Sequence, residues 1–159
     1  MEFKGTFEIN APQQVVFSHI TDIKWVSACL PTLSELKIKS KEDFEATFKV
    51  DVTEAAKKLH IEYLSQVTVK MAFKFLSMSV EKVVLEGSGR VVGGSLKIRI
   101  EFPIEGLDGK TRIPWTAHVD AGLLLKFFGE KLITDTSNEI VDGIVKCISE
   151  KLGKETQSN

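Results

Sequence analysis

The 159-residue sequence has only two cysteines, Cys29 and Cys147, and they match neither a CxxC pair nor a zinc-ligand spacing. We therefore expect no structural metal. Their spacing leaves a disulfide open, but two distant cysteines in a chain without a recognisable secretion signal favour free thiols and a cytoplasmic location. No apolar run approaches the length of about 18 residues that a transmembrane helix needs.

The sequence also lacks an excess of charge of either sign. Its 21 Lys and Arg residues balance 22 Asp and Glu residues, which leaves a formal net charge of -1. A surface that neutralises nucleic-acid phosphates needs a positive excess, so no nucleic-acid partner is expected. Apolar residues at 43% and charged residues at 27% are typical of a folded globular protein. The length fits one domain, predicted at residues 1–153, with a polar, frayed tail at 154–159.

The N-terminal residues 2–10 alternate between apolar and polar side chains, which predicts a half-buried strand. Pro12 ends this strand because it has no N–H to donate, and it is well suited to begin a helix. A second short helix is predicted after Asp22, whose carboxylate can cap the first turn. This helix should end before Pro31.

Alternation returns over residues 36–121, with large apolar side chains in one phase and charged side chains in the other. This pattern is typical of an antiparallel sheet with one wet face and one covered face. Only residues 123–152 are long enough and periodic enough to provide the cover. The sequence therefore predicts an α+β fold with its helices on one side of an antiparallel sheet.

The predicted C-terminal helix is not uniform along its length. From Leu123 to Phe128 the apolar side chains spread over roughly 200° of helix surface, which is more than one packing face requires. Residues 134–138 are mediocre helix formers, and Thr136 and Glu139 have the spacing of a capping box. Two interpretations stay open: the first half closes a cavity or touches a membrane, or one continuous helix packs throughout.

Neither the glycines nor the histidines indicate a phosphate-binding, metal-binding or catalytic site. Gly87-Ser88-Gly89 and Gly93-Gly94 are followed by a strand-like segment rather than a helix, so they are expected to be turn, bulge or hairpin glycines and not a phosphate loop. His19, His60 and His118 lie on different predicted elements without metal-ligand spacing, and His118 has the opposite phase from Trp115 on its strand, so it should point away from Trp115. No nucleophile motif is present, so neither a catalytic residue nor a metal ligand is predicted.

The element order and a series of short motifs resemble a known family. The motifs are Gly5, Ile9, Ala11-Pro12, Val16-Phe17, Asp22, Ala28-Cys29-Leu30-Pro31, Phe44-Glu45-Ala46, Gly87-Ser88-Gly89, Gly93-Gly94 and Lys110-Thr111. Together they resemble the CoxG family, the G subunit of carbon monoxide dehydrogenase, in the START-like, or SRPBCC, helix-grip superfamily. The resemblance covers nearly the whole chain and implies a curved antiparallel sheet wrapped around a long C-terminal helix, with a hydrophobic cavity between them.

Three features of this sequence depart from the family pattern. Trp115 stands where the family usually has a tyrosine, and residues 53–59 are longer and more charged than the usual short turn. The sequence ends in KETQSN, where many relatives carry a hydrophobic anchor. We therefore expect at most transient, peripheral membrane contact.

The resemblance also implies a function. It implies binding of a lipophilic small molecule, most simply a quinone-type lipid, by an accessory, electron-transfer or membrane-recruitment factor of a molybdenum-containing CO dehydrogenase-like enzyme. No cofactor is required and no enzyme activity is implied, and the expected location is cytoplasmic, at or near the inner membrane surface. Two alternatives stay open: a cyclase or hydrolase of the same superfamily, and a ligand-free assembly factor.

Eight residues are candidates for ligand binding because they should face the implied cavity or its mouth. Aromatic side chains on the inner face of a sheet are mostly core residues. Tyr63 and Trp115 are favoured because each carries a polar group that can orient a carbonyl or a hydroxyl. The full candidate set is Phe44, Phe48, Tyr63, Phe73, Trp115, Leu124, Phe128 and Leu132.

Overall fold

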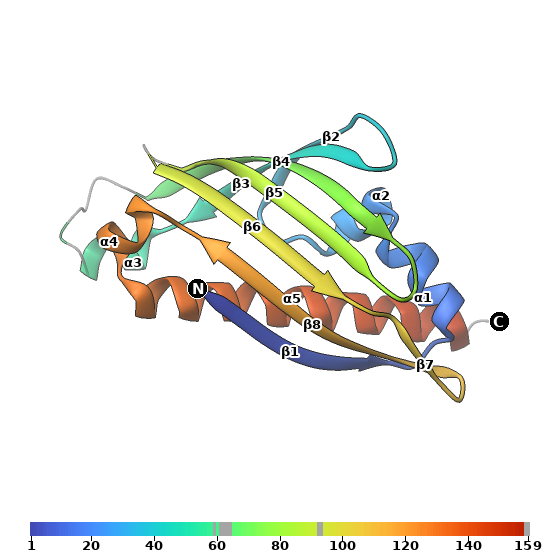
Figure 1. Ribbon diagram of the computed structural model, residues 1–159. Coiled ribbons are helices and arrows are strands. Elements are labelled where there is room, and N and C mark those ends of the chain that lie inside the picture. Colours follow the sequence, from blue (N-terminus) through green and yellow to red (C-terminus); the bar gives the residue numbers. More distant parts are fainter. Residues whose placement is uncertain (59, 61–64, 92–93, 158–159) are drawn as a thin grey trace.

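The computed structural model describes residues 1–58, 60, 65–91 and 94–157, and it confirms the α+β helix-grip architecture (Figure 1). An antiparallel sheet has the strand order β1-β8-β6-β5-β4-β3-β2, and β7 pairs with β8. The elements are β1 Glu2–Ile9, α1 Gln13–Ile20, α2 Ile23–Val26, the 3-10 helix η1 Ser27–Cys29, β2 Leu33–Ile38, β3 Asp43–Asp51, α3 Thr53–Lys58, β4 Gln66–Met78, β5 Val83–Val91, β6 Gly94–Phe102, β7 Glu105–Leu107, β8 Lys110–Asp120, α4 Leu123–Phe128 and α5 Glu130–Gln157.

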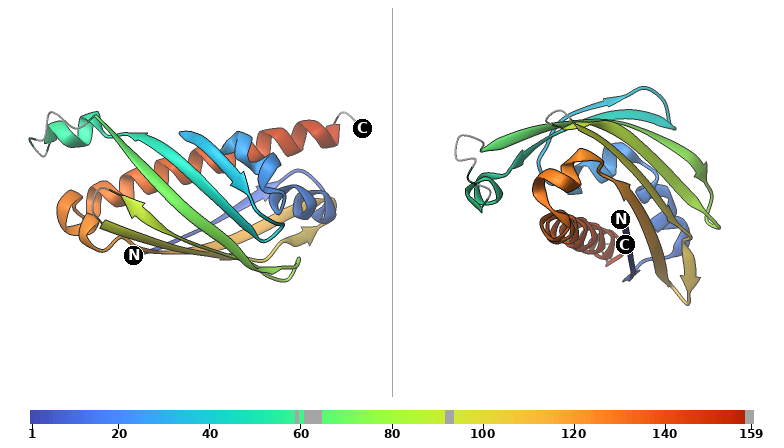
Figure 2. Two further views of the ribbon diagram at one scale, coloured as in Figure 1. Left: turned by 90° about the horizontal axis from the view of Figure 1, so that it is seen from above. Right: turned by 60° about the vertical axis from the view of Figure 1, so that its left-hand side comes forward.

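The sheet is curved, and α5 lies along its concave side (Figure 2). The first strand of the sequence, β1, pairs with the last one, β8, from Glu2 opposite His118 to Ile9 opposite Thr111. At one end of this pair the N-terminal amine donates to the carbonyl of Val119 at 2.8 Å. The N-terminus is thereby held on the sheet at the end of β8.

The short helices after β1 follow the predicted signals. Pro12 precedes α1, and its carbonyl accepts the N–H of Val16 at 3.0 Å. The Asp22 carboxylate accepts the N–H groups of Lys24 and Trp25, as expected of an N-cap residue. Both predicted helices are therefore confirmed.

The expectation of free thiols is wrong, because Cys29 and Cys147 form a disulfide. The two cysteines are 118 positions apart in the sequence, and their Cα atoms are 5.5 Å apart. Sequence spacing gives no sign of this proximity, since it results from the packing of α5 beside η1. The argument from free thiols to a reducing compartment therefore no longer holds.

The C-terminal helical region is interrupted at Gly129, not near residues 134–138. Gly129 separates α4 from α5 and has a φ of 84°, a conformation that L-residues rarely adopt. From Glu130 the helix continues without a break to Gln157, which is beyond the predicted helix end at 152 and the expected tail boundary at 153. The capping-box spacing at Thr136 lies within a continuous helix.

Two further segments differ from the sequence-based expectation. Residues 53–58, in the segment that departs from the family pattern, form the helix α3. Gly87 and Gly89 lie within β5 instead of in a turn, bulge or hairpin. A Cβ at Gly87 would lie 2.5 Å from Cε1 of Phe73, so this glycine makes room for an aromatic ring on the neighbouring strand.

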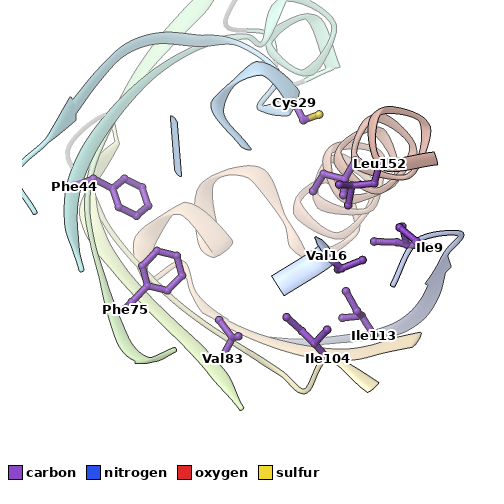
Figure 3. Close-up of a cluster of buried hydrophobic side chains, with 11 residues drawn as sticks. Ile9, Val16, Cys29, Phe44, Phe75, Val83, Ile104, Ile113 and Leu152 are labelled. Atoms are coloured by element: carbon purple, nitrogen blue, oxygen red, sulfur yellow. The ribbon is translucent and has the colours of Figure 1, made fainter. Parts of the chain in front are cut away.

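The main hydrophobic core lies at the end of the sheet that is covered by α1, η1 and the last turns of α5 (Figure 3). Figure 3 shows Phe44 and Phe75 projecting inward from the sheet, with Ile9, Val16 and Leu152 on the other side of the cluster. We call this cluster the closed core. Its members are Ile9, Ala11, Val16, Cys29, Phe44, Phe75, Val83, Ile104, Ile113, Ile148 and Leu152.

Candidate functional site

The concave face of the sheet is apolar along the described strands. Because side chains alternate across a strand, the charged residues of these strands fall on the opposite, convex face. On β6, for example, Leu96, Ile98 and Ile100 face inward, while Lys97 and Arg99 face outward. Apart from the buried Thr111 hydroxyl, which donates to the Ala11 carbonyl, the interactions that the concave face of the described strands offers are apolar contacts and those of the Trp115 indole.

The concave face is unevenly covered. Toward the end that carries α4, several large inward-facing side chains are only half-buried, whereas others on the same face of β4, such as Met71 and Val67, are buried at 3% and 6% exposure. The main packing partners of α5 are α4, β1 and η1, rather than the central strands β3 to β6. We call this region the α4 end, and its half-buried sheet residues are Phe48, Val69, Leu96, Ile98 and Val119.

The first half of α5 matches this pattern. Residues 130–147 include no buried side chain, whereas Ile148 and Leu152 are buried in the closed core. The six residues of α4 likewise include none that is buried. The α4 end is therefore lined in part by apolar side chains that have not completed their burial, beside buried ones such as Val67 and Val91.

Three predicted site residues lie on α4 and the start of α5, and all three are half-buried. The Cγ atom of Leu124 is 3.4 Å from the position of a Cβ on Gly94, so Leu124 lies over the start of β6. Phe128 meets Phe127 edge-on, with ring centroids 5.3 Å apart. Leu132 lies in the first turns of α5.

The neighbouring residues of α4 are turned toward solvent. Leu123 is 63% exposed and Phe127 is 55% exposed, and their spacing of four positions places them on the same side of the helix. Gly122 and Gly129, both with positive φ, flank this helix. An exposed apolar pair thus lies beside the half-buried residues of the α4 end.

The predicted aromatic residues on β3 and β4 divide between the closed core and the α4 end. Phe44 is 3% exposed, belongs to the closed core and stacks on Phe73, with ring centroids 5.0 Å apart and an interplanar angle of 18°. Phe73 is half-buried over Gly87. Phe48 is farther along β3, opposite Val69. Tyr63, the remaining aromatic candidate before β4, lies outside the described residues.

Trp115 lies on the β1 side of the sheet, and β6 and β5 separate its strand from β4. Its indole ring covers Gly5, where an added Cβ would come within 2.7–2.8 Å of three ring atoms. It also lines a cavity of about 190 Å³ between β1 and α5, together with Phe7, Asn138 and Asp142. Trp115 is therefore not grouped with the aromatic residues of β3 and β4.

The convex face has a different chemistry. A shallow depression of about 860 Å³ lies over the outer surface of the strands and is lined partly by charged residues. Hydrogen bonds to Glu101 and Glu86 raise the pKa of Arg99, and the hydrogen bond from Arg99 lowers the pKa of Glu101. His118 lies 3.5 Å from Glu2 on this face, which confirms that it points away from Trp115. These contacts describe a solvated face held by ion pairs.

Sequence reasoning missed several features of the site region. Leu96, Ile98 and Val69 lie in the apolar phase of their strands, but they are not among the predicted ligand-binding residues, because periodicity does not show which part of a face lacks cover. The break at Gly129 had a readable signal, since a glycine after an apolar helical run is a common helix terminator. Within the described part of the chain, no group of three His, Cys, Asp or Glu residues could hold a metal ion.

Solved structures that resemble this chain share its fold at low sequence identity. A conserved protein from Geobacillus kaustophilus has a TM-score of 0.82 at 13% identity, and 97% of this chain and 96% of that chain are covered. A START superfamily protein from Mycobacterium smegmatis has a TM-score of 0.69 at 11% identity, covering 98% and 99%. The Zhui aromatase/cyclase from Streptomyces sp. R1128 has a TM-score of 0.52 at 16% identity, covering 96% and 88%. At these identities the likeness shows the START-like fold alone.

The remaining findings concern membrane helices, curated relatives and the family of the chain. Over the described residues, no helix is both long and apolar enough to cross a membrane. None of the curated proteins matches this chain. The profile of CoxG, the G subunit of carbon monoxide dehydrogenase, matches residues 5–153, which span nearly the whole of the fold described above, and the chain therefore belongs to the CoxG family.

Proposed function

We propose that this protein binds a lipophilic, uncharged small molecule of the quinone type between the α4 end of the concave sheet and the helices α4 and α5. The observation that carries the proposal is the incomplete burial of apolar side chains that face inward from both sides. They include Phe48, Val69 and Ile98 on the sheet, and Leu124 and Leu132 on the helices. A ligand placed there would complete their burial.

The energetic argument follows from the area that such a ligand would withdraw from water. Each 100 Å² of apolar surface buried contributes about 2.5 kcal/mol. Ordering the ligand and the side chains offsets part of this gain, so an affinity in the micromolar range is the natural expectation. No covalent step is required.

The chemistry of the concave face favours a neutral ligand. On the described strands the Lys, Arg and His side chains lie on the convex face or at the strand ends, so a buried carboxylate would have no cationic partner on the concave face. Burying an unpaired charge is far more costly than burying a carbonyl that accepts one hydrogen bond. These features support a quinone over a fatty acid.

The family supplies the setting of the proposal. Membership in CoxG links the chain to a CO dehydrogenase system, and we propose that the bound lipid connects a molybdenum-containing enzyme of this type to the membrane electron pool. Leu123 and Phe127 on α4 would provide transient, peripheral contact with the inner membrane surface from the cytoplasmic side. The apolar character of the concave face supports a carrier more than a cyclase, which would need groups that transfer protons.

The test measures quenching of Trp115 fluorescence by ubiquinone-1 in a Trp25→Phe background, which leaves one tryptophan. We expect saturable quenching in the micromolar range that palmitate does not compete away. Val69→Asp should weaken the binding at least tenfold, while its matched neighbour Thr68→Asp, which lies on the convex face, should leave it unchanged. Equal affinity in the two variants, or no saturable quenching at all, would contradict the proposed site.

Native mass spectrometry of the protein purified without detergent addresses the alternative of a ligand-free assembly factor. A carrier should release a neutral lipid on organic extraction. A protein that is consistently empty, and that also fails to bind ubiquinone-1, would favour the assembly role.

A further inference from the structure

The disulfide lies where the long helix meets the short helices. Cys29 is the last residue of η1, is 5% exposed and belongs to the closed core, and its sulfur points toward α5 in Figure 3. Cys147 lies on α5 directly before the buried Ile148, and it is less deeply buried than Cys29. The bond therefore joins α5 to η1, which is one of its main packing partners together with α4 and β1.

At this position the disulfide restricts the movement of α5 relative to the sheet. Apart from α4, the main packing partners of the helix are β1 and η1, and only Ile148 and Leu152 among its described side chains are buried. Because α5 is continuous from Glu130 to Gln157, the position of its first half depends on how its second half is held. Its first half is also the part that faces the α4 end.

Non-covalent contacts remain in place without the bond. The Lys151 ammonium lies 4.6 Å from the centroid of the Trp25 ring, and this cation–π contact also joins α5 to the short helices. Together with the burial of Ile148 and Leu152, it would keep the reduced protein folded. Reduction would thus loosen α5 without releasing it completely.

We infer that the Cys29–Cys147 disulfide is a redox latch: when closed it holds α5 firmly over the concave face, and when a protein dithiol of the thioredoxin class reduces it, α5 loosens and ligand exchange becomes faster. The ligand part of this inference rests on the proposed function. A cytoplasmic location would strengthen it, because disulfides in that compartment are usually transient or redox-sensing.

The reaction is a thiol–disulfide exchange. A thiolate of the reductant attacks Sγ of Cys147, the more accessible of the two, and the Cys29 thiolate leaves and takes a proton. The second thiolate of the reductant then attacks the mixed disulfide and releases Cys147, which is also protonated. Two electrons pass from the dithiol, which becomes a disulfide, to the protein, which gains two thiols.

The first experiment compares amide hydrogen exchange of the whole protein in the oxidised form, after treatment with thioredoxin and its reductase, and in the C29S/C147S variant. We expect exchange in residues 141–152 to be about tenfold faster in the reduced and variant proteins, with β4 and β5 unchanged. Alkylation of both thiols should confirm reduction. K151A is the matched control: it removes a non-covalent link between α5 and α2, the helix directly before η1, and should keep the response to reductant.

The second experiment measures the dissociation rate of ubiquinone-1 in the same samples, with circular dichroism to verify that the reduced protein is folded. Dissociation should be several-fold faster without the disulfide. Identical exchange and dissociation in both redox states would overturn the latch. A bond that resists the dithiol, even though C29S/C147S is loosened, would show a static crosslink. Failure of ubiquinone-1 to bind in either state would instead count against the proposed function, and the exchange data would still decide whether α5 is released.

Discussion

The closed core and the α4 end are built from the same kind of side chains, yet they bury them to different extents. At the closed core, β-strand residues meet α1, η1 and the last turns of α5, and Val83, Ile113 and Leu152 are almost inaccessible to solvent. At the α4 end, equally apolar residues such as Ile98 remain half-buried. The difference shows that apolar patterning specifies which face turns inward, while the covering elements decide whether that face becomes core or a site.

The largest expected difference in the free energy of unfolding is between two variants that each place a carboxylate at one end of the concave face. Val83→Asp should cost about 3–5 kcal/mol, because Val83 has 0% exposure and the new charge would lack a partner. Ile98→Asp should cost much less, because water can reach its half-buried side chain. Chemical denaturation of both variants measures the difference. Similar losses would mean that the α4 end is as tightly packed as the closed core.

Truncation of one leucine in each half of α5 sharpens the comparison. Leu152→Ala should lower the free energy of unfolding by about 3 kcal/mol, because it leaves a void among fully buried neighbours. Leu132→Ala should lower it by less than about 1 kcal/mol, because part of that side chain is already exposed. Urea denaturation monitored by circular dichroism provides the measurement. A loss at Leu132 equal to that at Leu152 would argue against an unfilled site beside α5.

A smaller effect is expected at the junction between α4 and α5. Gly129→Ala should destabilise the fold by about 1 kcal/mol, because alanine disfavours the φ of 84° observed there. Gly143→Ala, with open space around it within α5, should stabilise the fold by about 0.5–1 kcal/mol. Thermal unfolding should show a lower melting temperature for Gly129→Ala and a higher one for Gly143→Ala. A stabilising effect at Gly129 would imply that the two helices can merge into one.

The smallest expected effect is a loss of local stability in α3 at acidic pH. Hydrogen bonds from the Thr53 hydroxyl and then from its N–H lower the pKa of Asp51, the last residue of β3, below the ordinary value of 3.8, and Thr53 is the first residue of α3. A lowered pKa stabilises the folded form above pH 3.8, and this contribution is lost as the pH falls through the folded-state pKa. Amide exchange in α3 should therefore show more opening in strong acid than at neutral pH after correction for intrinsic rates, and Asp51→Asn should weaken that pH dependence. An unchanged profile in the variant would remove Asp51 as the cause.

The sequence was sufficient to predict the layers of the fold. Alternation placed the strands and their inner faces, and Pro12 and Asp22 located the short helices because proline and cap residues act locally. The same local logic predicted that His118 faces away from Trp115. These features depend on neighbours within a few positions.

The features that escaped prediction depend on distant contacts. The bond between Cys29 and Cys147 requires α5 to lie beside η1, and the strand position of Gly87 is explained only by the Phe73 ring on the neighbouring strand. The division of Phe44 and Phe73 between core and half-buried surface likewise depends on which elements cover them. The sequence therefore predicts which face of the sheet carries the candidate site, but it does not predict which part of that face the site occupies.

The crosslink between Cys29 and Cys147 also changes the topology of the covalent structure. In the oxidised protein, residues 29–147 form one closed ring, and only the segments on either side of it behave as free chain ends. Mechanical tension applied at the two termini would bypass that ring through the sulfur–sulfur bond. Along the covalent chain, the strands β2 to β8 would thus carry no tension, and β8 would be loaded only through its pairing with β1.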